Sequence, residues 1–222
     1  MKMFPWLMAI ALTLSLNTAQ AGVIIGGTRV IYPGGKKEAS LNVKNPDKHS
    51  YLIQSWIDNE GNEKAPFIIT PPLFRLGATE DNALRIVRTG GQLPEDRESM
   101  FWMNIKTIPA TEKQENVNTL QIAIKTRLKL IYRPQSLTAA PETQANKLSW
   151  QRNGQRLIVN NPTPYYMNFS VVNVGHSMVK DATYVAPMST ATFTLPANAT
   201  GDVSWKIISD FGAAGKEYRA HL

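Results

Sequence analysis

Apolar and polar residues alternate along most of this chain, and helical spacing of apolar residues is scarce. Ala39, Leu41 and Val43 alternate with polar neighbours, as in a strand with one buried face. Short apolar runs recur at 51–57, 67–70, 84–87 and 100–105, with turn-forming residues such as Pro33-Gly34-Gly35 between them. About seven short strands at this spacing predict an antiparallel β-sandwich.

A second series of apolar runs follows, at 148–150, 156–160, 166–174, 183–185, 191–195 and 203–209. Asn153-Gly154 between the first two runs indicates a β-hairpin. The polar, Pro- and Ala-rich stretch from Pro134 to Asn146 separates the two series, and we expect it to be a linker with the domain boundary near residue 137. The pattern therefore predicts an all-β chain with two β-sandwich domains, at residues 22–137 and 138–222.

The first 21 residues have the features of a secretory signal peptide. Lys2 precedes an apolar stretch at 8–16, and Ala19-Gln20-Ala21 is the small-residue pattern that signal peptidase cuts. The stretch is shorter than the ~20 apolar residues of a stable membrane anchor. A buried N-terminal helix is the alternative. We expect export, cleavage after Ala21 and a soluble mature chain that starts at Gly22.

Composition narrows the function classes. The chain has no cysteine, which excludes disulfides and thiolate metal sites even though secretion would permit disulfides. Lys and Arg number 24 against 17 Asp and Glu, and removal of Lys2 leaves 23 − 17 = +6 on the mature chain. The basic residues are scattered, so we expect no nucleic-acid partner, whereas a basic patch that meets an acidic partner stays open.

Signals for catalysis are weak. The three histidines, at 49, 176 and 221, show no ligand spacing, and no Gly-rich phosphate loop or nucleophile elbow is present. Asp96 and Glu98 flank Arg97, a pattern more typical of a salt bridge than of acid–base chemistry. We expect no catalytic residue, no metal, no cofactor and no small-molecule substrate.

The most informative segment runs from Thr119 to Tyr132, 14 residues without Pro or Gly, which is long for a strand. Leu120, Ile122 and Ile124 share one parity. One interpretation is an ordinary edge or core strand. The other is a strand whose apolar row is lent to another protein, because exposed strand edges recruit other chains unless they are blocked.

The segment from Leu120 to Pro134 resembles the signature of the periplasmic pilus (fimbrial) chaperones, the family of the P pilus and type 1 pilus chaperones. Five other motifs occur in the family's order and extend the resemblance over essentially the whole mature chain: 28–32, the Pro-Pro loop at 70–76, 93–101, and, in the second half, 161–166 and 209–212. The resemblance implies two immunoglobulin-like domains in an L-shaped arrangement with an interdomain cleft, and a cis proline bond in the Pro71-Pro72 loop.

The resemblance also implies a function. Family members hold pilus subunits that lack the last strand of their own immunoglobulin-like fold, and deliver them to an outer-membrane usher from the periplasm. Leu120, Ile122 and Ile124 match the donor residues that enter the subunit. Arg29 and Lys129 match the basic residues that bind its C-terminal carboxylate. The charged residues that bridge the domains match Glu98, Arg133 and Asp210.

Some features depart from the family or stay open. Some relatives have a disulfide in the second domain, and Asn118 stands where a further donor residue could sit. The short stretch Thr107–Val117 resembles the short-loop subgroup. The sequence leaves open whether the free protein self-associates through its donor edge. A pilus subunit or adhesin, and a periplasmic sugar-binding module, are the alternative functions, although the two complete strand series and the dispersed tryptophans favour neither.

Overall fold

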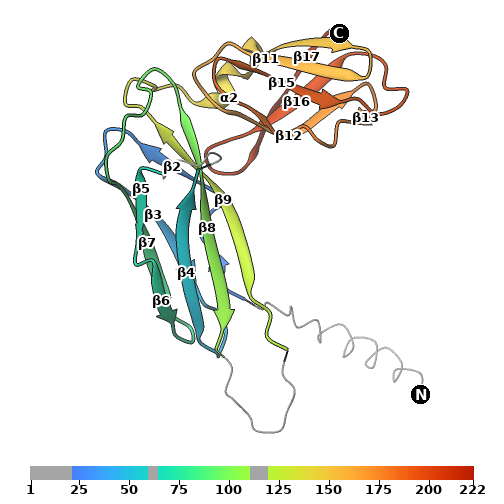
Figure 1. Cartoon of the computed structure of the whole chain (residues 1–222). Coiled ribbons are helices and arrows are strands. Elements are labelled where there is room, and N and C mark those ends of the chain that lie inside the picture. Colours follow the sequence, from blue (N-terminus) through green and yellow to red (C-terminus); the bar gives the residue numbers. More distant parts are fainter. Residues whose placement is uncertain (1–21, 60–64, 111–119) are drawn as a thin grey trace, which may run out of the picture.

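The computed structural model describes residues 22–59, 65–110 and 120–222. The expected signal peptide (1–21), Asn118 and most of the stretch Thr107–Val117 lie outside the described residues, so those three predictions stay predictions. The protein consists of two β-sandwich domains arranged as an L, with the second domain lying across one end of the elongated first domain (Figure 1). Among the described residues, no helix has the length and apolar character needed to cross a bilayer.

The first domain packs two sheets face to face. One has the order β1-β3-β7-β5, from β1 (Ile24–Ile25), β3 (Glu38–Lys44), β7 (Asp81–Arg88) and β5 (Phe67–Thr70). The other has the order β2-β9-β8-β4-β6, from β2 (Arg29–Pro33), β9 (Ile124–Arg133), β8 (Ser99–Pro109), β4 (Tyr51–Asp58) and β6 (Leu73–Leu76). The outer face of this second sheet is turned toward the second domain, where Lys129 contacts Asn168.

The second domain is a smaller sandwich. One sheet has the order β10-β11-β15, from β10 (Ser149–Asn153), β11 (Arg156–Asn161) and β15 (Ser189–Thr194). The other has the order β13-β12-β16-β17, from β13 (Ser177–Met178), β12 (Met167–Val174), β16 (Val203–Ile208) and β17 (Ala214–Ala220), with β14 (Tyr184–Val185) also paired with β12. The strand β17 was not among the predicted runs.

Each domain has its own hydrophobic core, as the strand alternation predicts. On β9, Leu128, Leu130 and Tyr132 point into the first core and are at most 7% exposed. Lys129 and Arg133, which alternate with them, are only half-buried, whereas Ile131 is buried outside that core. Burial of each core side chain contributes roughly 1.5–3 kcal/mol. The C-terminal half of β9 is therefore a fixed core strand of the first domain.

The predicted linker is only partly correct. Residues from its second half form α2 (Pro141–Gln144) and η1 (Ala145–Lys147), and Ala145 is fully buried in the second core. The Trp205 indole Nε1–H donates to the Ala145 carbonyl at 3.2 Å, and the Tyr218 hydroxyl donates to the Glu142 carbonyl at 2.6 Å. The composition of the stretch predicts a linker, but its backbone carbonyls and Ala145 pack against the second domain. The boundary at residue 137 stays a prediction.

The structure shows the backbone geometry of two turns that the sequence predicts. The Thr70–Pro71 peptide bond is cis, in the Pro-Pro loop where the resemblance implied one. The β10–β11 hairpin is present, but Asn153 pairs with Arg156, so the loop residues are Gly154 and Gln155 rather than Asn153 and Gly154. Gly154 has a φ of 59°, a conformation that glycine adopts without a steric penalty.

Candidate functional site

The two cations that the resemblance assigned to the cleft lie side by side. The parallel pairing of β2 with β9 sets Arg29 directly opposite Lys129. On the other side of β9, Lys129 lies opposite Trp102 of β8. Like charges directly opposite each other in a sheet are destabilising. Two adjacent cations are therefore a feature that an anionic partner would stabilise.

Arg29 carries a buried polar atom without an acceptor. Its Nε is inaccessible to solvent and has no hydrogen-bond partner among the described residues. Burial lowers the pKa of the Arg29 guanidinium, and the nearby charge of Asp210 opposes that shift. A half-buried guanidinium that lacks part of its hydrogen bonding favours a carboxylate ligand, because charge-assisted bonds are the stronger kind.

Lys129 reaches across to the second domain. Its ammonium donates to Oδ1 of Asn168 on β12 and lies 4.3 Å from the centroid of the Tyr184 ring. The ring of Trp102 is 5.9 Å from the same ammonium. Sequence reasoning found Lys129 but missed Asn168 and Tyr184, because they come from a different domain and carry no motif of their own. Both domains thus define the position of this cation.

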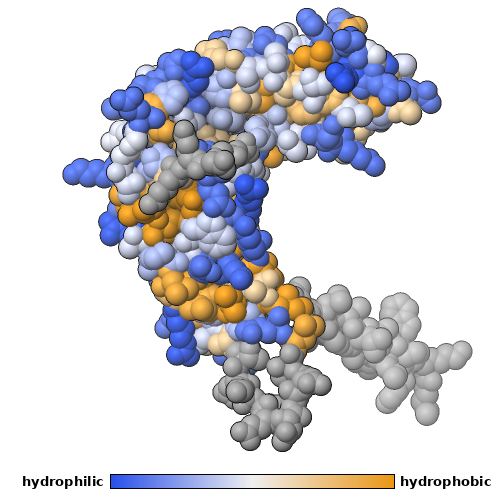
Figure 2. Space-filling view, in the orientation of Figure 1, coloured by the Kyte–Doolittle hydropathy of each residue, from blue (hydrophilic) through white to orange (hydrophobic). Residues whose placement is uncertain are grey.

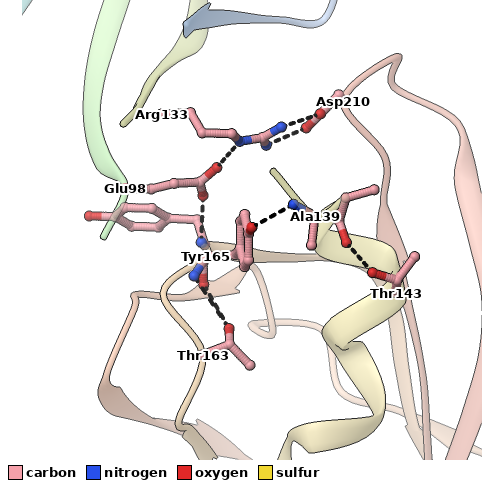
Figure 3. Close-up of polar contacts among 9 residues, drawn as sticks. Glu98, Arg133, Ala139, Thr143, Thr163, Tyr165 and Asp210 are labelled. Carbon is pink, nitrogen blue, oxygen red and sulfur yellow. Dashed lines mark hydrogen bonds and ion pairs between the residues drawn. The ribbon is translucent and has the colours of Figure 1, made fainter. Parts of the chain in front are cut away.

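Glu98, Arg133 and Asp210 form one connected network at the hinge (Figure 3). Arg133, the last residue of β9, donates to Glu98 at 2.7 Å and makes two bonds to the Asp210 carboxylate at 2.6 and 2.8 Å. Glu98 accepts from the Tyr166 N–H at 2.7 Å, and its own N–H donates to the Pro164 carbonyl at 2.9 Å. Asp210, Tyr166 and Pro164 belong to the second domain, so these bonds join the two domains.

The hinge network is largely withdrawn from water. The side chain of Glu98 is 1% exposed and that of Arg133 is 14% exposed. Burial raises the pKa of Glu98, although the charge of Arg133 and the Tyr166 N–H oppose it. Burial would lower the pKa of Arg133, but hydrogen bonds to Asp210 and the charge of Glu98 outweigh it and raise that pKa. The partners therefore outweigh burial at Arg133, whereas burial outweighs the partners at Glu98.

Part of β9 is an open sheet edge. Because β2 begins at Arg29, opposite Lys129, residues 124–128 pair with β8 on one side only, among the residues that the structure describes. Figure 1 shows the lower part of β9 at the border of the first domain. The prediction of a strand from Thr119 was wrong in extent, since β9 begins at Ile124. Leu120 and Ile122 precede it, and among the residues that the structure describes they pair with no other strand.

The three predicted donor residues are exposed. Leu120 is 87% exposed, Ile122 64% and Ile124 55%. Ile124 lies opposite Thr107, on the same face of β9 as the core residue Leu128, whereas Lys129 lies on the outer face. Hydrophobic residues gather at the end of the first domain farthest from the second (Figure 2). Apolar side chains of this size at a strand edge indicate an interaction surface.

The described residues contain no group of three or more His, Asp or Glu side chains close enough to hold a metal ion. The described features are a cation pair, an open sheet edge and exposed apolar residues, an arrangement that is suited to binding a polypeptide.

Comparison with known proteins decides the family. Residues 22–138 match the model of the pili and flagellar-assembly chaperone PapD N-terminal domain, and residues 143–219 match that of the pili assembly chaperone PapD C-terminal domain. The chain belongs to this family. The other two sequence interpretations, a pilus subunit and a sugar-binding module, are therefore set aside.

Individual relatives agree with this assignment. The chaperone protein FocC of Escherichia coli is 47% identical over 204 residues, covering 90% of this chain and 89% of the relative. The chaperone protein FimC of Escherichia coli K12 is 46% identical over 199 residues, with coverage of 88% and 82%. A chain in the structure of the Salmonella enterica SafA pilin with the SafB chaperone matches with a TM-score of 0.86 and 39% identity, over 92% of this chain and 98% of that one. These relatives are named as chaperones and not as enzymes.

Proposed function

We propose that this pilus chaperone binds pilus subunits by lending them the open edge of β9 together with Leu120, Ile122 and Ile124, and by binding their C-terminal carboxylate with Arg29 and Lys129. The observation that carries the proposal is that the open edge ends at the adjacent Arg29 and Lys129. A subunit strand that pairs with residues 124–128 lies on the same side of β9 as β2, end to end with it. It must therefore stop where β2 begins, at Arg29.

The same geometry gives the direction of the bound strand. If the subunit chain ends at the cation pair and extends back along residues 124–128, its C-terminus lies toward the C-terminal end of β9. The added strand then runs parallel to β9, as β2 does. Backbone hydrogen bonds along the edge supply affinity with little dependence on sequence. The carboxylate contact sets the register, because it fixes where the pairing begins.

The exposed apolar residues supply the remaining contact. A subunit that lacks one strand of its sandwich cannot bury its own core, and an apolar side chain inserted into it contributes roughly 1.5–3 kcal/mol. We assign this role to Leu120, Ile122 and Ile124. The hinge residues Glu98, Arg133 and Asp210 have a positioning role, since they hold the second domain where Asn168 and Tyr184 can contact Lys129.

The proposal places the mature protein in the periplasm, after cleavage behind Ala21, where it delivers subunits to an outer-membrane usher and catalyses no reaction. Amino-terminal sequencing of the protein from a periplasmic extract tests the cleavage site, and a sequence that begins elsewhere than Gly22 contradicts it. Sedimentation of the free protein tests whether the exposed donor residues cause self-association.

Subunit binding is tested by co-expression with pilus subunits and isolation of a one-to-one complex from the periplasm. Lys129→Ala and Arg29→Ala should each abolish the complex while the unfolding midpoint stays close to that of the parent. Lys147→Ala, an exposed lysine on η1, is the control and should leave the complex intact. A complex that survives both cleft substitutions would remove the carboxylate role, and a parent chain that binds no subunit would remove the proposed function.

A further inference from the structure

A row of three cations follows the outer face of β9 from the cleft toward the donor residues. Lys125, Arg127 and Lys129 are every second residue, so their Cα atoms are spaced by about 6.6 Å. Lys125 and Arg127 are exposed, and Lys129 is half-buried. The proposed carboxylate site uses only the last member of this row.

Aromatic rings of neighbouring strands hold the first two cations in place. The Lys125 ammonium lies 5.0 Å from the centroid of the Trp56 ring, which belongs to β4, so the side chain extends across β8. The Arg127 guanidinium lies 4.2 Å from the centroid of the Trp102 ring on β8. Cation–π contacts restrict the side chains but leave their positive charge without a counter-ion. Among the described residues, neither cation forms an ion pair.

Among the described residues, this face of the sheet is predominantly positive. Lys106 of β8 lies directly opposite Lys125, which repeats the like-charge arrangement of Arg29 and Lys129 at the other end of the row. Such pairs destabilise a sheet in the free protein. In the part of the chain that the structure describes, Asp58 lies on the same face, and its carboxylate accepts a hydrogen bond from Asn104 at 2.8 Å. The arrangement is therefore suited to an anionic partner.

We propose that Lys106, Lys125 and Arg127 form a second anion site, which accepts acidic side chains of the pilus subunit bound along β9. We call these three residues the acid-reading site. The inference rests on the proposed function, because a strand on the open edge at 124–128 brings the subunit against this face. Through Lys125 and Arg127, the site is continuous along β9 with Lys129, and its charge selects subunits with Asp or Glu at the matching positions. Its main effect is on the rate of binding, since exposed charges steer association more than they add affinity.

The test compares two double variants that remove the same charge. Lys125→Gln with Arg127→Gln removes two cations from the acid-reading site. Lys36→Gln with Lys37→Gln removes two exposed cations from the β2–β3 turn and is the control. Both are mixed with the subunit identified by the co-expression experiment, which is diluted from denaturant, and the association rate constant is measured over a range of ionic strength.

We expect the first double variant to bind about tenfold more slowly than the parent at low ionic strength, and at about the same rate near 1 M salt, where the screening length is about 3 Å. The control should follow the parent at every salt concentration. Lys106→Gln, on the neighbouring strand, should change the rate in the same direction by a smaller factor. A second arm reverses the charges with Lys125→Glu and Arg127→Glu, and a subunit with its facing acidic residues changed to Lys should regain rapid binding.

Equal rates and equal salt dependence for both double variants would overturn the acid-reading site. A loss that persists unchanged at high salt would also overturn it, because it would indicate altered strand structure. In either case the proposed function stands as long as the complex still depends on Lys129. If the parent chain binds no subunit, the proposed function fails first and the acid-reading site fails with it.

Discussion

Arg133→Met should open the hinge between the domains. Arg133 is the one cation that contacts both Glu98 and Asp210 among the residues the structure describes, and methionine keeps part of its length without its charge. The substitution leaves Glu98 with a side chain that is 1% exposed and with one remaining side-chain contact, the Tyr166 N–H. The carboxylate of Glu98 is then a buried charge without a counter-ion.

The expected loss is large. Removal of one partner of a buried ion pair destabilises a protein by about 3–5 kcal/mol, whereas replacement of both partners is often close to neutral. The double variant Glu98→Gln with Arg133→Met should therefore lie within about 1–2 kcal/mol of the parent. Because Glu98 lies between the domains, the protein can also rehydrate the carboxylate by separating them. Part of the effect of the substitution should then be a changed arrangement of the two domains.

The effect of Arg133→Met should depend on pH. Burial already raises the pKa of Glu98 above its ordinary value of 4.5, and loss of Arg133 raises it further. Between the unfolded and folded pKa values the folded variant binds a proton that the unfolded chain does not, so stability falls as pH rises. The defect is therefore full at pH values above the folded pKa, and it diminishes as pH falls through that value toward 4.5.

Urea unfolding at several pH values measures the free energy of unfolding, and small-angle X-ray scattering reports the domain arrangement. Asp210→Asn is the graded control, because the Asp210 side chain is 26% exposed and its loss should cost less, on the order of 1–2 kcal/mol. If Arg133→Met is as stable as the double variant at neutral pH, with unchanged scattering, the reasoning about a buried unpaired carboxylate is wrong.

Three further predictions follow from local geometry. Serine at all three donor positions (Leu120, Ile122, Ile124) should abolish isolation of the subunit complex without lowering the unfolding midpoint, because these side chains are exposed; a lower midpoint would show that they support the chaperone's own fold. Tyr51 donates to Asp47 at 2.6 Å, and this bond raises the pKa of Tyr51 to about 12. The parent should therefore lose stability as pH rises from 10 to about 12, and Tyr51→Phe should weaken that dependence in alkaline unfolding curves, while Tyr132, whose pKa is also raised, still contributes to it; an unchanged curve would contradict the assignment. Gly212 has a φ of 85°, and a Cβ there would lie 2.5 Å from Oγ1 of Thr28, so Gly212→Ala should destabilise the protein by about 1–3 kcal/mol in urea unfolding; equal stability would show that the loop shifts freely.

The alternation of apolar residues was enough to predict the fold class and most strands. This pattern could not predict a strand that has no row of buried apolar residues. The strand β17, AGKEYRA, has no fully buried residue and lies at a sheet edge, so its pairing with β16 supplies what its side chains do not. The prediction for Pro141–Lys147 was incomplete for another reason. The segment has the composition of a polar linker, but it packs against the second domain through Ala145 and through backbone carbonyls.

Some residues of the candidate site could be predicted from the sequence, and others could not. The resemblance supplied Arg29 and Lys129, and only the parallel pairing of β2 with β9 shows that they are adjacent. Asn168 and Tyr184 could not be predicted, because their contacts with Lys129 depend on how the second domain is placed. The same applies to Trp56, whose contact with Lys125 crosses a whole strand. Contacts that depend on tertiary placement leave no periodic signal in the sequence.

The face of β9 that carries Ile124 is relevant to the proposed function, in which one strand contributes to two proteins. Leu128, Leu130 and Tyr132 fill the core of the first domain, and Ile124 continues the same row beyond the point where that core ends. A row of this kind is already oriented to enter a second sandwich that lacks a strand, because side chains of one parity share one face. The outer face is then free to carry Lys125, Arg127 and Lys129. A one-residue insertion between Arg127 and Leu128 would move Ile124 to the outer face and Lys125 and Arg127 to the inner face. It should therefore abolish the proposed donor and acid-reading roles while Leu128, Leu130 and Tyr132 keep their places in the core.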